Sequence, residues 1–201
     1  SIKLHEINIP EVHAAREAAG QGVPLMVDVN CPWTPEEAKS MALAFKAYDI
    51  LWLEEPINPP ENFQALSTLR TETEMAIAAG ENACTAFEFK KMMEANAIDY
   101  AQPSVTKVGG ITEFRKIATL CEVYGVQLMP HSPYFGPGFL ATLHLSQAIP
   151  NSGMIERIFI EPETNLYGNS TYDPVNGAFG APGGNGLGLE PDIDVLKTYR
   201  V

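Results

Sequence analysis

The sequence has few cysteines, few basic residues and no long apolar run. Its three cysteines, Cys31, Cys84 and Cys121, lie far apart without C-x-x-C spacing, so reduced thiols in a cytoplasm are expected. The apolar runs are too short to span a bilayer and no signal peptide is visible, which favours a cytoplasmic protein. Only 13 Lys and Arg accompany 25 Asp and Glu, giving a net charge of −12 without a basic run. This balance argues against nucleic acid and anionic membranes as partners.

Short apolar runs alternate with helical patterns along most of the chain. The hydrophobic fraction of 45% provides enough apolar material for one sizeable core. Apolar runs separated by helical patterns are typical of parallel strands joined by crossover helices, as in a TIM-type (β/α) barrel. The pattern predicts seven strands, at 2–9, 23–29, 51–55, 74–80, 97–103, 126–130 and 153–160, and six helices, at 11–20, 34–48, 61–70, 85–96, 111–125 and 138–149.

Three of these apolar runs end on a carboxylate. Asp28, Glu54 and Glu81 are 26 and 27 residues apart, about the length of one strand, one helix and two loops. In a β/α barrel, such residues sit side by side at the C-terminal rim of neighbouring strands, where barrel enzymes carry out their chemistry. Converging carboxylates repel one another unless a hard divalent cation neutralises them, and oxygen ligands favour Mg²⁺. Any one of these acids alone is typical of a solvated loop, but three at matching strand ends predict a Mg²⁺ site.

The strand count predicts an incomplete barrel. A complete β/α barrel has eight strands and typically about 250 residues, so the first strand is expected to be missing and to belong to a longer polypeptide or to another chain. We assign 1–160 to the barrel, from its second to its eighth strand. The Gly-, Pro- and Asn-rich remainder, 161–201, is interpreted as a loop-rich segment that packs on the barrel or on a capping domain.

The order of several short motifs resembles the enolase superfamily. Within it, the chain is most similar to the C-terminal barrel domain of the mandelate racemase and muconate lactonizing enzyme branch, from Ile2 to the end. The resemblance implies an N-terminal α+β capping domain that has no counterpart here, a homo-oligomer, and a small-molecule carboxylate as substrate. The motifs are V-D-V-N (27–30), W-L-E-E-P (52–56), G-E-N (80–82), P-S-V-T-K-V-G-G (103–110), M-P-H (129–131), I-E-R (155–157) and G-L-G-L-E (186–190).

The resemblance also implies a chemistry. Asp28, Glu54 and Glu81 match the family's Mg²⁺ ligands, and the shared step is abstraction of the proton α to a carboxylate to give an enediolate. Charge on the carboxylate oxygens is then stabilised electrostatically by the metal. Asn30 and Asn82, which follow two of the ligands, are expected to orient ligands or bind substrate oxygens. Glu55 is expected to lie behind the ligands or to support the strand end.

Candidate acids and bases flank the predicted metal site. In the I-K-L-H-E run, Lys3 and His5 point to the same face of a strand. Lys3 is a candidate to pair with the substrate carboxylate and His5 to act as base or acid, although both are also interpretable as solvated residues near a chain end. His131 matches a family histidine that works from the opposite side, as acid or base. Its usual aspartate partner, or the lysine of the lactonizing members, is replaced here by Ser104, which makes two-sided racemisation less expected.

Further residues are predicted to bind substrate: Ser104 and Lys107 beside the sixth barrel strand, Tyr134 in the pocket wall, and Glu156 on the substrate carboxylate. Three functions stay open. The first is a lyase that dehydrates a sugar acid, an aldonate or aldarate. The second is an isomerase, either a cycloisomerase or a racemase, that acts on a carboxylate. The third is a non-catalytic barrel fragment that keeps the metal ligands. A two-metal phosphoryl-transfer enzyme is less favoured because no phosphate-binding cluster of lysine or arginine is present.

Overall fold

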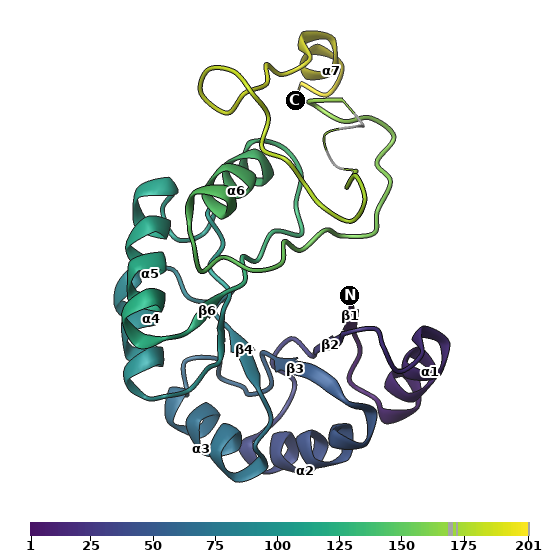
Figure 1. The fold of residues 1–201 in the computed structure, drawn as a ribbon, viewed down its shortest axis with the longest axis vertical. Coiled ribbons are helices and arrows are strands. Elements are labelled where there is room, and N and C mark those ends of the chain that lie inside the picture. Colours follow the sequence, from purple (N-terminus) through teal and green to yellow (C-terminus); the bar gives the residue numbers. More distant parts are fainter. Residues whose placement is uncertain (169–170, 172, 201) are drawn as a thin grey trace.

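The computed structural model describes residues 1–168, 171 and 173–200. Within these residues, one six-stranded parallel sheet has its strands neighbouring each other in chain order, and the helices between residues 9 and 124 line its convex side (Figure 1). Residues 169, 170, 172 and 201, which belong to the predicted C-terminal segment, lie outside the described residues. The strands are β1 (Ile2–His5), β2 (Leu25–Asp28), β3 (Ile50–Glu54), β4 (Ile77–Ala79), β5 (Tyr100–Ala101) and β6 (Gln127–Leu128); the helices are α1 (Ile9–Ala19), α2 (Pro35–Phe45), α3 (Phe63–Thr73), α4 (Ala86–Glu94), α5 (Ile111–Tyr124), α6 (Pro137–Ala148) and α7 (Ile193–Thr198), with a 3₁₀ turn at Lys46–Tyr48.

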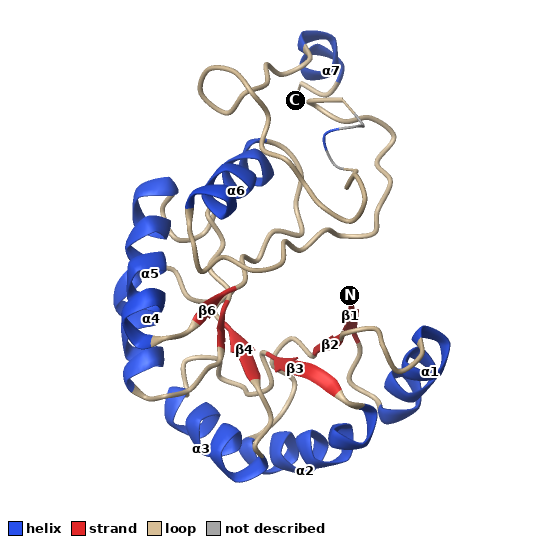
Figure 2. Ribbon diagram, in the orientation of Figure 1, coloured by secondary structure: helices blue, strands red, loops and turns tan. Residues whose placement is uncertain are grey.

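The helices begin and end where the sequence provides caps. Thr34 and Glu37 form a reciprocal capping box at the start of α2, with Pro35 in the first turn. Thr85 accepts the Glu88 backbone N–H at the start of α4. These caps fix where the loops after β2 and β4 stop, and Figure 2 shows loops joining the strands to the helices.

The largest core lies between the sheet and its helices. Strand residues such as Leu25, Val27 and Ile77 pack there against helix residues such as Phe89 and Phe114. The opposite face of the strands carries a smaller apolar cluster around Met26, Trp52, Ala78 and Met129. The strands are therefore buried on both faces, as expected for a parallel sheet.

The strand register places the polar residues at one level. His5 is paired with Asp28, and Asp28 with Glu54, across β1, β2 and β3. Two residues before His5 on β1, Lys3 is paired with Met26. Because residues i and i+2 of a strand share a face, Lys3 and His5 project to the same side as Asp28 and Glu54.

The prediction of a strand at 153–160 is wrong. All eight residues are described, and they form loop. Pairing with β6 begins at a bridge between Leu128 and Ser152 and continues with the Gly153 N–H donating to Leu128 O at 2.7 Å. It stops at the next residue, because the Met154 N–H faces the Met129 sulfur at 3.2 Å instead of a carbonyl. The ends of the sheet are therefore β1 and β6.

Residues 161–168, 171 and 173–200 consist mainly of loops, followed by α7. They contact α6 through an edge-to-face pair of Phe139 and Phe179, with ring centroids 5.4 Å apart. His144 Nε2 lies 3.1 Å from Leu187 O. Among the described helices, none is both long and apolar enough to cross a membrane.

Candidate active site

The three predicted strand-end carboxylates are buried. Asp28 ends β2 and Glu54 ends β3, and they are 1% and 0% exposed; Glu81 follows β4 and is 9% exposed. Removing several carboxylates from water is costly unless cations or hydrogen-bond donors compensate. Burial accordingly raises the pKa of Glu54, although the Lys3 ammonium opposes that shift.

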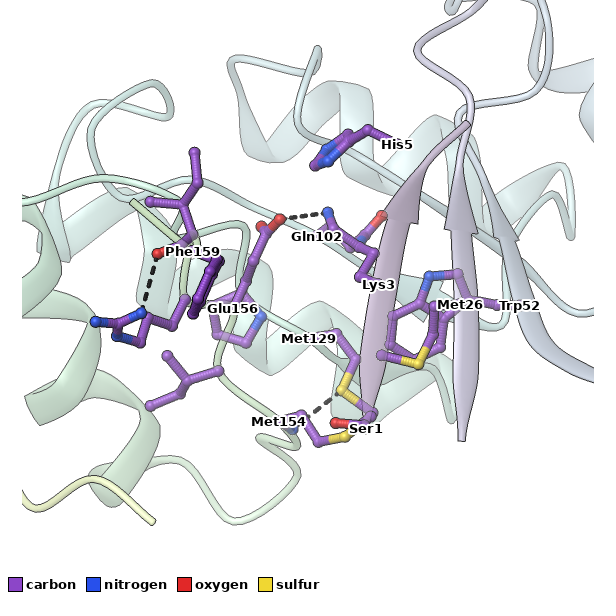
Figure 3. A pocket seen from close by; sticks show the side chains of 14 residues that line it. Ser1, Lys3, His5, Met26, Trp52, Gln102, Met129, Met154, Glu156 and Phe159 are labelled. Carbon is purple, nitrogen blue, oxygen red and sulfur yellow. Dashed lines mark hydrogen bonds and ion pairs between the residues drawn. The ribbon is translucent and has the colours of Figure 1, made fainter. Parts of the chain in front are cut away.

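Lys3 is the cation that joins two of these acids. Its Nζ lies 2.6 Å from Glu54 Oε1 and 3.2 Å from Asp28 Oδ2. It also lies 2.5 Å from Glu156 Oε1, on the loop that follows α6, as Figure 3 shows. Burial alone would lower the pKa of Lys3, but the three carboxylates outweigh it and raise that pKa. Held in this way, Lys3 is an ammonium and not a free base.

The two predicted histidines contact different acids. His5 Nε2 lies 3.0 Å from Asp28 Oδ2, and the His5 side chain is about half exposed. His131 is largely buried, with Nδ1 2.8 Å from Glu81 Oε2 and 3.5 Å from Glu156 Oε2. His131 therefore has two carboxylate neighbours, although Ser104 stands where the resemblance leads us to expect an aspartate or a lysine.

Glu81 is held in its charged form by its neighbours. Its burial would raise the pKa of the carboxyl group, but His131, Lys107 and Lys3 outweigh burial and lower it. Lys107 also donates to the Glu81 backbone oxygen at 3.0 Å. Lys107, which the sequence predicts to bind substrate, therefore contacts the backbone of one of the predicted metal ligands.

One group of side chains in the site could hold a metal ion. Ligand atoms of Glu54, Glu81 and His131 all lie within 4.8 Å of one another. Two buried carboxylates and an imidazole suit a divalent cation, so the donor set fits the predicted metal. Asp28 is not a member of this group, because its Oδ2 faces Lys3 and His5. The triad of Asp28, Glu54 and Glu81 stays a prediction.

The predicted asparagines lie at the exposed edge of the site. Asn30 has a left-handed backbone with φ of 55°, and its N–H donates to Asp28 Oδ1 at 3.1 Å. The Asn82 amide nitrogen lies 3.7 Å from Cys31 Sγ. Both side chains are exposed, so they are accessible to a ligand above the carboxylates.

Ser104 and Tyr134 belong to a group of hydroxyls. Ser104 Oγ lies 2.8 Å from Thr106 Oγ1 and donates to Tyr134 OH at 3.4 Å. Tyr134 also tilts toward His131, with ring centroids 6.4 Å apart. Glu156 is fixed from another direction, because the buried Ser132 hydroxyl donates to its backbone oxygen at 2.8 Å.

Two further side chains support the strand ends that carry the acids, and the sequence predicts such a role only for Glu55. Trp52 Nε1 donates to Glu54 Oε2 at 2.9 Å, and the signal for this contact is the i, i+2 spacing of the two residues on one strand. Glu55 was expected to support the strand end, and its Oε1 accepts the Gly80 N–H at 2.8 Å. Its Oε2 accepts from Cys31 Sγ at 3.4 Å. Burial raises the pKa of Glu55 to about 7.

A cavity of about 360 Å³ lies between β1 and the segment 153–159. Figure 3 shows that charged side chains and apolar side chains both project into it. Its charged wall contains Lys3 and Glu156, and its apolar wall contains Met26, Met154 and Phe159. The cavity separates the first strand of the sheet from the loop where a further strand was predicted.

The parallel sheet, its helices on one face and the acids at its strand ends define a β/α-barrel-like domain with a candidate metal site. The profile of the enolase C-terminal domain-like family matches residues 2–195. The chain belongs to this family of the enolase superfamily, and its solved neighbours include mandelate racemase and muconate lactonizing enzyme-like proteins. The predicted family and fold class are thereby confirmed.

Curated relatives include lyases and isomerases. The D-xylonate dehydratase of Haloferax volcanii is 31% identical over 206 residues, which cover 98% of this chain and 47% of that protein. The D-galactarolactone cycloisomerase of Agrobacterium fabrum is 31% identical over 209 residues, which cover 98% of this chain and 54% of that protein. The chain thus spans about half the length of the curated relatives it matches.

Solved structures show the same architecture. A mandelate racemase/muconate lactonizing enzyme-like protein from Rubrobacter xylanophilus superposes with a TM-score of 0.87 at 31% identity, covering 96% of this chain and 49% of that one. The L-talarate dehydratase of Polaromonas sp., solved with Mg and L-glucarate, gives a TM-score of 0.81 at 30% identity, covering 98% and 53%.

Proposed function

We propose that this chain is the barrel part of a Mg²⁺-dependent enzyme that abstracts the proton α to a carboxylate and dehydrates a sugar acid, an aldonate or aldarate. The observation that carries this proposal is the convergence of Glu54, Glu81 and His131 beside Lys3 and His5. Relatives named as sugar-acid dehydratases support it. The proposal also includes a cytoplasmic location, a homo-oligomer and a capping domain supplied by the rest of a longer protein.

The metal would be held by buried carboxylates. Glu54 and Glu81 fit this role, with either Asp28 or His131 as a third ligand. Bound Mg²⁺ would stabilise the negative charge that develops on the substrate carboxylate when the α-proton leaves. A cation would also relieve the repulsion between acids that Lys3 alone balances in part.

The chain's own residues would move the protons. His5, half exposed and 3.0 Å from Asp28, is the candidate base on the β1 side. His131, beside Glu81 and Glu156, is the candidate acid for the departing hydroxyl. Lys3 is better suited to bind the substrate carboxylate, because its carboxylate neighbours keep it protonated. Asn30, Asn82 and Tyr134 would contact the substrate's hydroxyl groups.

A cycloisomerase is the second candidate. It would use the same proton abstraction but open or close a ring instead of releasing water. The Lys3-x-His5 pair and Ser104 would suit it equally, with His131 beside Glu81 and Glu156 as the acid on one side. A relative named as a D-galactarolactone cycloisomerase supports this alternative.

The test is solvent deuterium exchange. The protein that contains this chain is incubated in D₂O with Mg²⁺ and a panel of aldonic and aldaric acids, and the α-proton signal is followed by NMR. We expect exchange that falls at least ~100-fold in Glu54→Gln, because the variant loses a charged ligand. Glu11→Gln, an exposed acid on α1, is the matched control and should exchange like wild type.

Mass spectrometry of the products separates the two candidates. Loss of one water identifies a dehydratase, and an unchanged mass with a new structure identifies a cycloisomerase. If Mg²⁺ binds but none of the acids exchanges, the proposal fails and a non-catalytic barrel fragment is favoured.

A further inference from the structure

We propose that Trp52 is a positioning residue whose indole N–H orients the Glu54 carboxylate for a divalent cation. The inference deepens the proposed function and rests on it in one respect, that Glu54 is a metal ligand. It assigns a role in the site to a tryptophan to which the sequence alone assigns none.

The hydrogen bond between the two side chains is buried. Trp52 and Glu54 are two residues apart on β3, so both project from the inner face of the sheet. Nε1 donates to Oε2 at 2.9 Å, and the two residues are 3% and 0% exposed. A hydrogen bond to a charged acceptor away from water is among the stronger ones in proteins. Water cannot easily replace the indole as donor at this depth.

Packing restricts the indole to this orientation. Trp52 shares the inner apolar cluster with Met26, Ala78 and Met129, and Figure 3 shows it next to Met26 on neighbouring strands. The Tyr100 ring lies beneath it, with centroids 4.7 Å apart. A ring packed on several sides has little freedom to rotate. The N–H is therefore aimed at Glu54 before any cation binds.

The donors around Glu54 contact different oxygens of its carboxylate. Lys3 contacts Oε1 at 2.6 Å, whereas Trp52 holds Oε2. Gln102 also hydrogen-bonds Glu54, and its own Oε1 is buried without a hydrogen-bond partner among the described residues. Each oxygen keeps a further lone pair for a cation, and the two donors fix the plane of the carboxylate and so the direction of those lone pairs. Groups that orient metal ligands in this way commonly affect metal affinity 10- to 100-fold.

The first experiment removes the N–H and keeps an aromatic ring. Mg²⁺ affinity is measured by calorimetry and Mn²⁺ affinity by electron paramagnetic resonance on wild type, Trp52→Phe and Trp33→Phe. We expect the dissociation constants to rise about 10- to 100-fold in Trp52→Phe. Trp33 packs against Phe45 in the helix-facing core, so Trp33→Phe should bind both ions like wild type. Circular dichroism and thermal unfolding establish that each variant is folded.

A second measurement does not need the Trp52 variant. The chain has two tryptophans, so Trp33→Phe leaves Trp52 as the sole indole fluorophore. We expect Mg²⁺ to change its emission, and the added substitution Glu54→Gln to abolish that response. A Trp52 emission change that follows the calorimetric saturation curve ties the surroundings of the indole to occupancy of the cation site.

The outcomes separate the inference from the proposed function. If a folded Trp52→Phe binds Mg²⁺ as tightly as wild type, the role of Trp52 is overturned while the metal site stands. If Trp52→Phe does not fold, the fluorescence titration decides, and an unresponsive Trp52 emission in metal-bound protein overturns the inference. If the wild-type chain binds neither ion, both proposals fail together.

Discussion

On the face of the sheet that meets the helices, strands bury apolar residues such as Leu53 and Ile77, whereas on the opposite face apolar and charged side chains lie in adjacent layers. The helix-facing core gains free energy from every apolar group it removes from water. The inner face buries acids that need compensation. Stability and chemistry are thus assigned to opposite sides of the same strands, and substitutions on the two sides should have separable effects.

The largest effect on stability is expected from the helix-facing core. Phe114 on α5 is 0% exposed and belongs to the main core. Phe114→Ala should lower the free energy of unfolding by about 3–5 kcal/mol, through lost burial and a residual cavity. Urea unfolding followed by circular dichroism measures this loss. The control is Phe87→Ala on α4, where the ring is 77% exposed and the change should stay below about 0.5 kcal/mol.

The contrast between the two faces also explains which features the sequence predicts. The alternation of strands and helices, and the acids at the ends of β2, β3 and β4, follow from patterns within single segments. The partners of those acids do not, because they depend on how side chains from different strands meet. The contact of His131 with Glu81 joins residues 50 positions apart, and no spacing within a single segment predicts it.

The wrong strand at 153–160 has a related cause. Its apolar residues fit a buried strand, and such a pattern describes the side chains without showing whether a neighbouring backbone is available for pairing. In the structure, the Met154 N–H faces the Met129 sulfur and Phe159 is 92% exposed. The loop nevertheless places Glu156 in contact with Lys3 and His131. The contact that matters for the site therefore survives the loss of regular pairing.

A second prediction concerns the strand ends, where burial of an acid should reduce stability. Burial raises the pKa of Glu55 from 4.5 to about 7, so between these values the folded state holds a proton that the unfolded state has lost. The contribution of Glu55 to the free energy of unfolding is therefore greatest below about pH 4.5. It falls as the pH rises from 4.5 to 7. The total loss is about 3 kcal/mol, and it levels off above pH 7.

Glu55→Gln isolates this contribution. The amide oxygen can still accept the Gly80 N–H that Glu55 Oε1 accepts at 2.8 Å, but it carries no charge. Urea unfolding at several pH values, with chelator present, should show a flatter profile for the variant and a higher stability at pH 7. A variant profile that falls as steeply as that of wild type would assign the slope to other groups.

The smallest effect is expected at a helix cap on the outer side of the molecule. The Thr34 Oγ1 accepts the Glu37 N–H at 3.4 Å, and Glu37 Oε2 accepts the Thr34 N–H at 2.9 Å. These hydrogen bonds hold the pKa of Glu37 below its usual value. Thr34→Ala should lower the free energy of unfolding by about 1 kcal/mol, and Thr34→Ser should restore most of it. Because α2 lies outside the sheet, Mg²⁺ affinity should be the same in all three proteins. A change in that affinity would show that the helix-facing side and the inner face of the sheet are coupled. The route would be the loop that follows Asp28 and leads into α2.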